Sequence, residues 1–180
     1  MDREKVDTFK YVREMNELLK DSGLFLVTGS MENNERLKHN AMTIGWGFLG
    51  TMWSRPVFAV AVRHSRYTFK LLEESKSWTV CVPAKEMAMA LEFCGTQSGR
   101  DVDKFKEMNF TAKKGVEIEA PYIEECPIHV ECETIFKTDM KPGQLKAGIE
   151  KELYKTKDYH MIYFGEVKGV YAVKDAEKLT

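Results

Sequence analysis

Two stretches of the sequence bring together residue types that bind anions. One is Arg63-His64-Ser65-Arg66-Tyr67-Thr68, which follows an apolar run and supplies hydroxyls, guanidinium groups and the free N–H groups of a helix start. The other is Ser98-Gly99-Arg100-Asp101-Val102-Asp103-Lys104, which combines a turn, a helix start and a lysine. Such groups favour phosphate. The residues leave two interpretations open: one shared phosphate site, or plain helix caps at Ser65 and Asp101 with exposed charges.

A glycine pattern lies upstream of these stretches. Gly45-Trp46-Gly47-Phe48-Leu49-Gly50 matches the G-x-G-x-x-G pattern of dinucleotide-binding turns. That chemistry needs a helix to begin here, and Pro56 follows too soon to allow one. We therefore expect a strand whose glycines either let a flat ligand approach closely or form a bulge.

The cysteines and histidines do not indicate a metal site. Cys126, His129 and Cys132 form a C-x-x-H-x-x-C pattern, but side chains alternate along a strand, so His129 would face away from both thiols. We expect reduced, packed thiols here and no metal. The sequence also lacks a G-x-S-x-G elbow, an H-E-x-x-H motif and a paired-carboxylate signature of hydrolysis.

The elements that must position these residues are mainly extended. Apolar periodicity predicts a helix over residues 5–20 ended by Gly23, and further helices over 65–72, over 85–93 and from Asp101. Strands are predicted at residues 24–28, 40–48, 57–62, 78–82, 128–136 and 160–173, with Gly165 and Gly169 as sites of bending. Residues 137–157 are rich in lysine and predict an exposed excursion between two strands. The fold class expected is therefore mainly β with α (α+β).

Length and charge limit the classes of protein. The chain has 180 residues and a mass of 20.8 kDa, which fits one domain over residues 1–180. Its 27 Lys plus Arg nearly balance 28 Asp plus Glu, so we expect neither nucleic acid nor a membrane as a partner. The N-terminus is charged, and no apolar run reaches the ~18 residues of a membrane span. A cytoplasmic location is the expectation.

The order of several short blocks resembles the flavin reductase-like family of FMN-binding split β-barrels, and within it the flavoredoxin group. The resemblance covers roughly residues 24–110 well, with a weaker echo at Cys126-Pro127 and over residues 160–167. The blocks are Asn40-Ala41-Met42-Thr43-Ile44-Gly45-Trp46, Pro56, Arg63 to Thr68, Cys94-Gly95, Ser98-Gly99-Arg100-Asp101 and Lys104-Phe105.

This resemblance implies a Greek-key-like antiparallel barrel with peripheral helices, and a homodimer with FMN near the subunit interface. It implies that the strand from Asn40 to Trp46 holds the isoalloxazine edge, through Asn40, Ala41, Met42, Thr43 and Trp46. The ribityl-phosphate end would be held by Arg63, Ser65, Tyr67, Thr68, Ser98, Gly99 and Lys104, where the residues themselves already indicate an anion. Phe164 and His160 would lie near the ring or its nicotinamide face.

Three functions fit this resemblance. The first is an NAD(P)H-dependent flavin reductase that accepts hydride at FMN and passes electrons on; aligning two rings needs no acid–base pair. The second is a flavoredoxin-type electron carrier that is reduced by a redox-partner protein. The third is a non-catalytic barrel that binds some other phosphorylated aromatic ligand, with pyridoxal phosphate and haem as the candidates. The lysines of residues 137–157 could serve an NADPH 2′-phosphate or an acidic redox partner.

Overall fold

One large antiparallel sheet organises the chain. In the computed structural model, which describes residues 2–31 and 39–180, it runs in the order β3-β2-β6-β9-β10-β5-β4, and β1 adds to β10. A separate two-stranded sheet is formed by β7 (Ala112–Lys114) and β8 (Pro121–Ile123). The strands of the large sheet are β1 (Arg3–Val6), β2 (Leu24–Thr28), β3 (Asn40–Ile44), β4 (Gly47–Met52), β5 (Arg55–Arg63), β6 (Ser77–Val82), β9 (Ile128–Asp139) and β10 (His160–Val173).

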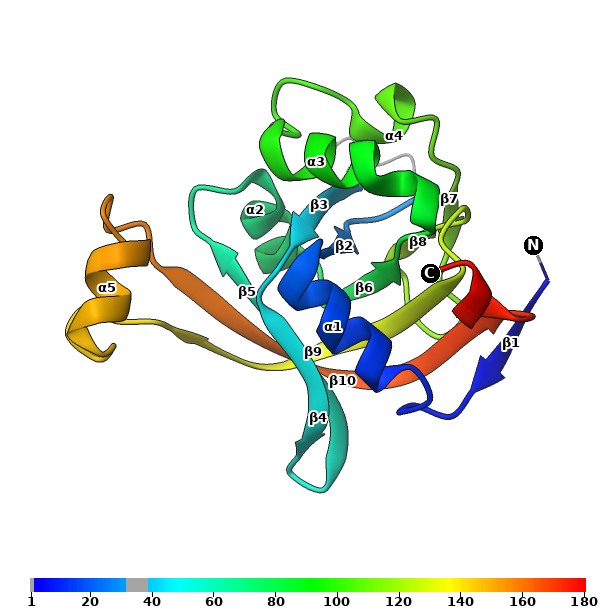
Figure 1. Ribbon diagram of the computed structural model, residues 1–180, viewed down its shortest axis with the longest axis horizontal. Helices are drawn as coiled ribbons and strands as arrows, with labels where there is room; N and C mark the ends of the chain where they lie inside the picture. The colour runs from blue at the N-terminus through cyan, green and yellow to red at the C-terminus, as the bar shows by residue number, and fades with distance from the viewer. Residues whose placement is uncertain (1, 32–38) are drawn as a thin grey trace.

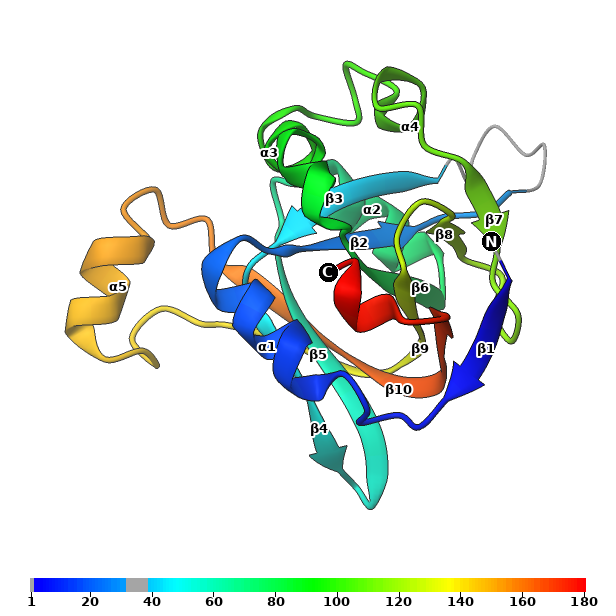
Figure 2. The same cartoon turned by 45° about the vertical axis from the view of Figure 1, so that its right-hand side comes forward.

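The helices lie at the periphery of this sheet. α1 (Val12–Asp21) crosses one side of the barrel and packs on β4 and β2, whereas α3 (Ala88–Thr96) packs on β3 (Figures 1 and 2). α5 (Ala147–Leu153) stands away from the barrel at the end of an arm between β9 and β10 (Figure 1). The remaining helical segments are α2 (Tyr67–Glu74), α4 (Lys104–Glu107) and the short 3₁₀ turns η1 (Lys85–Met87) and η2 (Ala176–Lys178).

The barrel closes where β3 passes into β4. These strands are consecutive in the chain but lie at opposite ends of the sheet order. The chain bends between them at Gly45-Trp46, where the Trp46 carbonyl accepts a hydrogen bond of 3.0 Å from the Ala61 N–H of β5. The bend brings the end of β3 next to the end of β5, and this seam is where ligand-sized space remains.

The core has two parts on opposite faces of the sheet. Alternating residues fill the barrel interior, where Trp78, Tyr163 and Phe58 are fully buried. The second cluster lies between the outer face of β2, β3 and β6 and the covering α3 and α4, and includes Phe25 and Leu91. Side chains that alternate along β2 and β6 enter the two clusters in turn. Both faces of these strands are therefore buried and largely apolar.

The structure confirms several of the predicted elements. β2 and β10 have the predicted bounds, and β5, β6 and β9 overlap the predicted strands. The pairing of β10 with β9 shifts register between Phe164 and Gly165 and again between Val167 and Gly169, as the glycines predicted. Gly23 has a φ of +99° directly after α1, the conformation expected at a helix end. The prediction of a mixed α+β, predominantly antiparallel fold is confirmed.

Other predicted elements are wrong in extent. Residues 3–6 form β1 on β10, so the first helix begins at Val12 and not at residue 5. The predicted strand over 40–48 is divided by the seam bend into β3 and β4. Ser65 is not a helix cap: α2 begins at Tyr67, and the Ser65 hydroxyl donates to the Asp158 carboxylate at 2.6 Å. The cap of α4 is Asp103 rather than Asp101.

The motifs discounted as a dinucleotide-binding turn and a metal site lie in or beside strands. The G-x-G-x-x-G glycines lead into and along β4, and no helix follows them. His129 is fully buried and stacks between Tyr122 and Tyr171, with ring centroids 3.9 and 5.2 Å away. The four cysteines are free and buried. Among the described residues there is no group of three potential metal ligands and no helix long and apolar enough to cross a membrane.

Candidate functional site

Two adjoining hollows lie at the barrel seam. They share Met42, Ser65 and Arg66, and enclose about 440 and 780 Å³ of free space, including the part open to solvent. The basic hollow is lined by Asn40, Met42, Ser65, Arg66, Tyr67, Thr68, Thr96, Gln97, Ser98, Gly99, Arg100 and Lys104. The aromatic hollow is lined by Met42, Thr43, Ile44, Gly45, Trp46, Ala61, Arg63, Ser65, Arg66 and His160. Together they have the dimensions of a cofactor cleft.

Close packing of three segments builds the basic hollow. The amide of Asn40 on β3 donates to the Thr68 hydroxyl of α2 at 2.9 Å. A Cβ on Gly99 would overlap both the Asn40 side chain and the Tyr67 ring. The loop after α3 can therefore lie against β3 and α2 only because glycine occupies position 99.

The cations of the basic hollow face neutral carbonyl groups. Lys104 Nζ donates to the Cys94 carbonyl at 2.7 Å, Arg66 to the Gly95 carbonyl at 2.5 Å, and Arg100 to the Ser65 carbonyl at 3.0 Å. Within residues 2–31 and 39–180, none of the three has a carboxylate within ion-pair distance. Three positive charges in one hollow without a carboxylate in direct contact favour an anionic ligand.

Burial perturbs two of these groups. Lys104 is only 4% exposed, and burial lowers its pKa to about 8. Burial, and then the neighbouring Arg63, lower the pKa of Arg66. A buried ammonium with only a carbonyl partner is costly, and a phosphate placed in the hollow would supply the missing negative charge.

The aromatic hollow combines a partly exposed ring with a neutral histidine. The Trp46 ring is 38% exposed, and its centroid lies 4.5 Å from that of His160. Burial, and next the charge of Arg63, lower the pKa of His160 to about 4, so it is neutral at pH 7. This hollow therefore offers a planar surface and an uncharged imidazole, which suits a flat ligand.

Arg63 belongs to this second hollow. It was expected at the ribityl-phosphate end, but its guanidinium donates to the backbone carbonyls of Asp158 at 2.5 Å and Leu153 at 3.1 Å. It also lies over the Tyr154 ring, 5.2 Å from the centroid. Through these contacts, Arg63 connects the arm that carries α5 to the end of β5. The pairing of Arg63 with His160 on β10 brings the two segments together.

The structure brings together most of the predicted site residues. Asn40, Met42, Ser65, Tyr67, Thr68, Ser98, Gly99 and Lys104 line the basic hollow, and Thr43, Trp46 and Arg63 line the aromatic hollow. The Thr43 hydroxyl is engaged with the Leu91 carbonyl at 2.5 Å, so it anchors α3. Ala41 is fully buried in the cluster beneath α3 and lines neither hollow.

Phe164 lies outside both hollows. It faces Phe136 and Trp53, with ring centroids 5.6 and 6.1 Å away, on the outer face of the sheet. Its pairing partner on β5 is Ala59, four residues from Arg63. At about 3.4 Å per residue, this separation removes Phe164 from the seam.

Sequence reasoning missed several lining residues. Arg66 and Arg100 lie inside the predicted anion-binding stretches but were not named as site residues. Hydrogen bonds to backbone carbonyls direct their side chains, from Arg66 to Gly95 and from Arg100 to Ser65. Thr96 is the last residue of α3 and Gln97 follows it, whereas the predicted helix ended at residue 93. Ala61 lines the aromatic hollow because its N–H donates to the Trp46 carbonyl. The sequence carries no local signal for this contact.

Comparison with known proteins agrees with this geometry. The sequence profile of the family described as "Flavin reductase like domain" matches residues 20–180. An uncharacterized protein of Archaeoglobus fulgidus is 30% identical over 137 residues, which is 76% of this chain and 74% of that protein.

Solved structures show the same fold. The flavoredoxin of Desulfovibrio vulgaris (Miyazaki F) superposes with a TM-score of 0.64 at 24% identity, covering 85% of this chain and 70% of that one. An FMN-binding protein from Thermus thermophilus, solved with bound 1-cyclohex-2-enone, has a TM-score of 0.64 at 20% identity over 88% of this chain and 76% of that one. With a seam cleft in an antiparallel barrel and a family match over residues 20–180, the chain belongs to the flavin reductase-like domain family.

Proposed function

We propose that the protein binds FMN across the two hollows and acts as an NAD(P)H-dependent flavin reductase. The observation that carries the proposal is the buried Lys104, grouped with Arg66 and Arg100 against neutral carbonyls, directly beside an aromatic hollow. Family membership and the FMN named for the Thermus thermophilus relative support flavin as the ligand.

The chain's residues divide the work between the two ends of the cofactor. Lys104, Arg66 and Arg100 would neutralise the phosphate, and the hydroxyls of Thr68 and Ser98 stand beside them as further donors. The backbone and side chains of residues 42–46 line the space for the ring. Bound flavin would supply the redox chemistry, accepting hydride from the nicotinamide. The protein then has to orient two rings and limit access of water.

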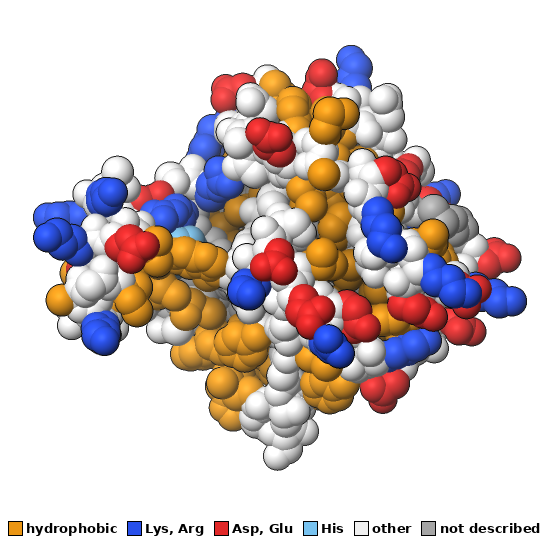
Figure 3. All heavy atoms as spheres, in the orientation of Figure 1, with side chains coloured by type: hydrophobic (Ala, Val, Ile, Leu, Met, Phe, Trp, Pro, Cys, Tyr) orange, Lys and Arg blue, Asp and Glu red, His pale blue; other side chains and the backbone are white. Residues whose placement is uncertain are grey.

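The alternative is an electron carrier reduced by another protein. The arm favours it, because it carries the exposed Lys141, Lys146, Lys151, Lys155 and Lys157, which could meet an acidic redox partner. Figure 3 shows Lys and Arg side chains gathered on the arm. The same lysines could instead attract the 2′-phosphate of NADPH. The cytoplasmic location stays a prediction.

Flavin loading followed by anaerobic reduction tests the proposal. The protein is loaded with FMN, desalted and scanned in the visible range, and NADH or NADPH is then added without oxygen. Retained flavin that bleaches within seconds supports the reductase. Retained flavin that stays yellow with both nucleotides contradicts it and favours the carrier, and loss of flavin on desalting would contradict the cofactor assignment.

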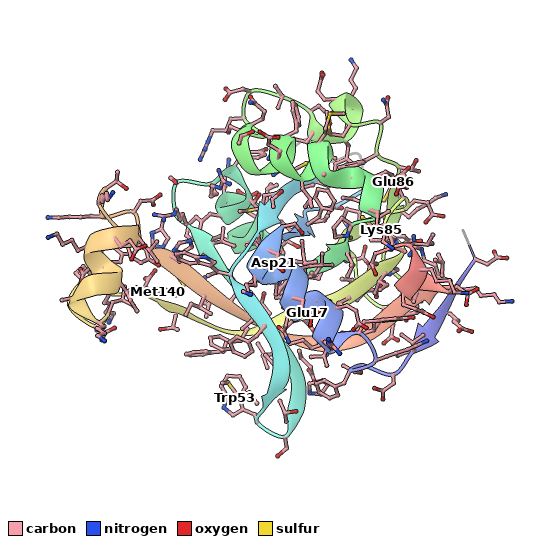
Figure 4. All side chains as sticks on the ribbon, in the orientation of Figure 1. Glu17, Asp21, Trp53, Lys85, Glu86 and Met140 are labelled. Atoms are coloured by element: carbon pink, nitrogen blue, oxygen red, sulfur yellow. The ribbon has the colours of Figure 1, made fainter. Side chains whose placement is uncertain are left out.

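We further propose that two copies associate through an apolar face. Phe48, Phe164 and Phe136 fall in one row across β4, β5, β10 and β9, because Ala59 pairs with both Phe48 and Phe164, and Phe164 pairs with Phe136. Trp53 and Met52 extend the row at the hairpin tip, where Trp53 projects from the barrel (Figure 4). We call these five residues the hairpin patch; Figure 3 shows hydrophobic side chains gathered beside the hairpin.

A further inference from the structure

The arm between β9 and β10 is anchored beside the aromatic hollow by a buried tyrosine. Tyr154, which directly follows α5, is only 3% exposed, whereas α5 itself has no buried residue. Its hydroxyl lies 2.7 Å from Nδ1 of His160 and 3.1 Å from the sulfur of Met140. Met140 lies at the base of the arm (Figure 4). Tyr154 therefore connects the arm to one residue of the candidate site.

The contact between Tyr154 and His160 couples the tautomer of the imidazole to the direction of one hydrogen bond. The Tyr154 hydroxyl has one hydrogen and two neighbouring acceptors, and a thioether sulfur is a much weaker acceptor than an imidazole nitrogen. Donation of the hydroxyl to Nδ1 uses the stronger acceptor, whereas donation to the Met140 sulfur would require Nδ1–H to donate to the hydroxyl. In the first arrangement, the single proton of the neutral imidazole is on Nε2.

The surroundings of His160 keep it neutral. Burial has the largest effect on the pKa of His160 and disfavours the cationic form. Arg63 at the end of β5 also disfavours it, as do Arg66 and His64 from the following turn. Asp158 on the arm favours the cationic form, but its effect is smaller than those of burial and Arg63. The Trp46 ring packs against the imidazole at 4.5 Å. His160 is thus neutral, and its ring is held between Trp46 and the Tyr154 hydroxyl.

The other nitrogen of His160 is available to a ligand. His160 lines the aromatic hollow, and Nε2 has no hydrogen-bond partner among residues 2–31 and 39–180. Nε2 is not among the fully enclosed polar atoms that lack a partner, so a ligand in the hollow can reach it. A neutral N–H donor here suits a carbonyl or carboxamide oxygen.

We infer that Tyr154 is a positioning residue, which holds His160 as a neutral Nε2–H donor for a carbonyl-type oxygen on the planar second substrate of the aromatic hollow. The inference rests on the proposed function for the presence of a flavin beside that substrate. It gives the arm a role in substrate selection, which Tyr154 exerts through His160.

Nitrogen-15 NMR of histidine-labelled protein tests the tautomer directly. In the FMN-loaded full chain, we expect His160 to show a protonated Nε2 and an unprotonated Nδ1 throughout pH 6 to 8, with its signals identified by the His160→Asn variant. In Tyr154→Phe we expect the Nδ1-protonated form to become populated. A wild-type His160 that carries its proton on Nδ1 would overturn the inference, even if the variant failed to fold.

A matched control separates positioning from packing. Tyr159 stacks on Tyr154 with ring centroids 4.7 Å apart, and its hydroxyl bonds to Glu150 instead of His160. Tyr159→Phe should leave the His160 signals unchanged. Equal changes in both variants would contradict a specific role for Tyr154. The same spectra recorded without FMN keep this test separate from the question of flavin binding.

Ligand titration provides the functional readout. Nicotinamide carries a carboxamide oxygen and 3-methylpyridine does not, so only nicotinamide can use the Nε2–H donor. In FMN-loaded Tyr154→Phe, we expect the Kd for nicotinamide to rise about threefold to tenfold, the range for one lost hydrogen bond, and that for 3-methylpyridine to stay unchanged. Equal weakening of both ligands, or no weakening of either, would overturn the assignment.

Discussion

Lys104 is the residue on which the phosphate end of the site depends. It is nearly inaccessible to solvent and donates to the Cys94 carbonyl, with Arg66 close enough to oppose its charge. The free protein therefore holds a destabilised ammonium. A phosphate would convert this unfavourable arrangement into a charge-assisted contact.

Removing that ammonium should weaken binding of FMN more than binding of riboflavin. For Lys104→Met we expect a loss of about 1.5 to 3 kcal/mol in FMN binding free energy, roughly tenfold or more in Kd. Riboflavin lacks the phosphate and should bind almost as before. Lys106→Met, two residues along and exposed, is the control. Fluorescence titration measures both ligands, and an unchanged FMN affinity would exclude Lys104 from the site.

The lowered pKa of Lys104 predicts a pH dependence of FMN binding. The pKa of about 8 in the free protein means that Lys104 loses its charge as pH rises through 8. Because a phosphate would stabilise the ammonium and raise its pKa, FMN affinity should fall above pH 8, and binding there should take up protons. Calorimetry in buffers of different ionisation enthalpy measures the uptake. Proton uptake of the same size in Lys104→Met would count against this explanation.

At the scale of elements, the start of α4 positions Lys104. The Asp103 carboxylate accepts hydrogen bonds from the N–H groups of Phe105 and Lys106, both at 3.2 Å, and so caps the helix. Lys104 is the first residue of α4. The cap therefore determines the direction in which the ammonium enters the basic hollow.

Removing the cap should lower both stability and FMN affinity. Asp103→Ala should reduce the free energy of unfolding by about 1 kcal/mol, as expected for a lost N-cap, and weaken FMN binding by displacing Lys104. Asp101→Ala removes an exposed carboxylate that does not cap α4 and is the matched control. Urea unfolding and FMN titration give the two values. Equal effects of the two substitutions would show that Asp103 has no special role.

Element boundaries show where local sequence signals are insufficient. The apolar spacing of residues 5–20 indicates one helix, but Arg3–Val6 gains a strand partner in residues 170–173 and the helix starts later. The run from Asn40 to Phe48 is continuous in character, yet it bends at Gly45-Trp46 because β4 must pair with β5. In both places, pairing with another strand outweighs local preference: with the distant β10 for Arg3–Val6, and with the next strand β5 for β4.

At the scale of the whole molecule, the hairpin patch predicts the oligomeric state. The exposed fractions of Phe48, Phe136 and Trp53 are 48, 47 and 54%, in one region of the outer sheet face. Contiguous exposed aromatic side chains are typical of interfaces. A second copy that covers the patch would remove this surface from water, in line with the homodimer expected from the family resemblance.

Light scattering after size-exclusion chromatography measures that state. We expect the wild type at twice 20.8 kDa and Phe48→Lys shifted towards monomer, because an ammonium in an apolar interface is costly. Ile149→Lys on α5, where the side chain is 45% exposed outside the hairpin patch, is the control and should remain dimeric. A wild-type monomer at micromolar concentration would contradict the dimer, and a dimeric Phe48→Lys would exclude the patch as its interface.

Features that depend on neighbours along the chain can be predicted from the sequence. The apolar strands, the glycine irregularities in β10 and the two anion-binding stretches follow from local residue types, and most candidate residues from Asn40 to Lys104 line one cleft. Tertiary structure decided which way the decisive side chains point. Arg63 turns to the arm, Phe164 joins the hairpin patch, and Tyr154 reaches His160. These outcomes depend on the register of β10 against its two neighbours, β5 and β9. The pairing with β5 alone joins residues about 100 positions apart, and local residue types do not set such a register.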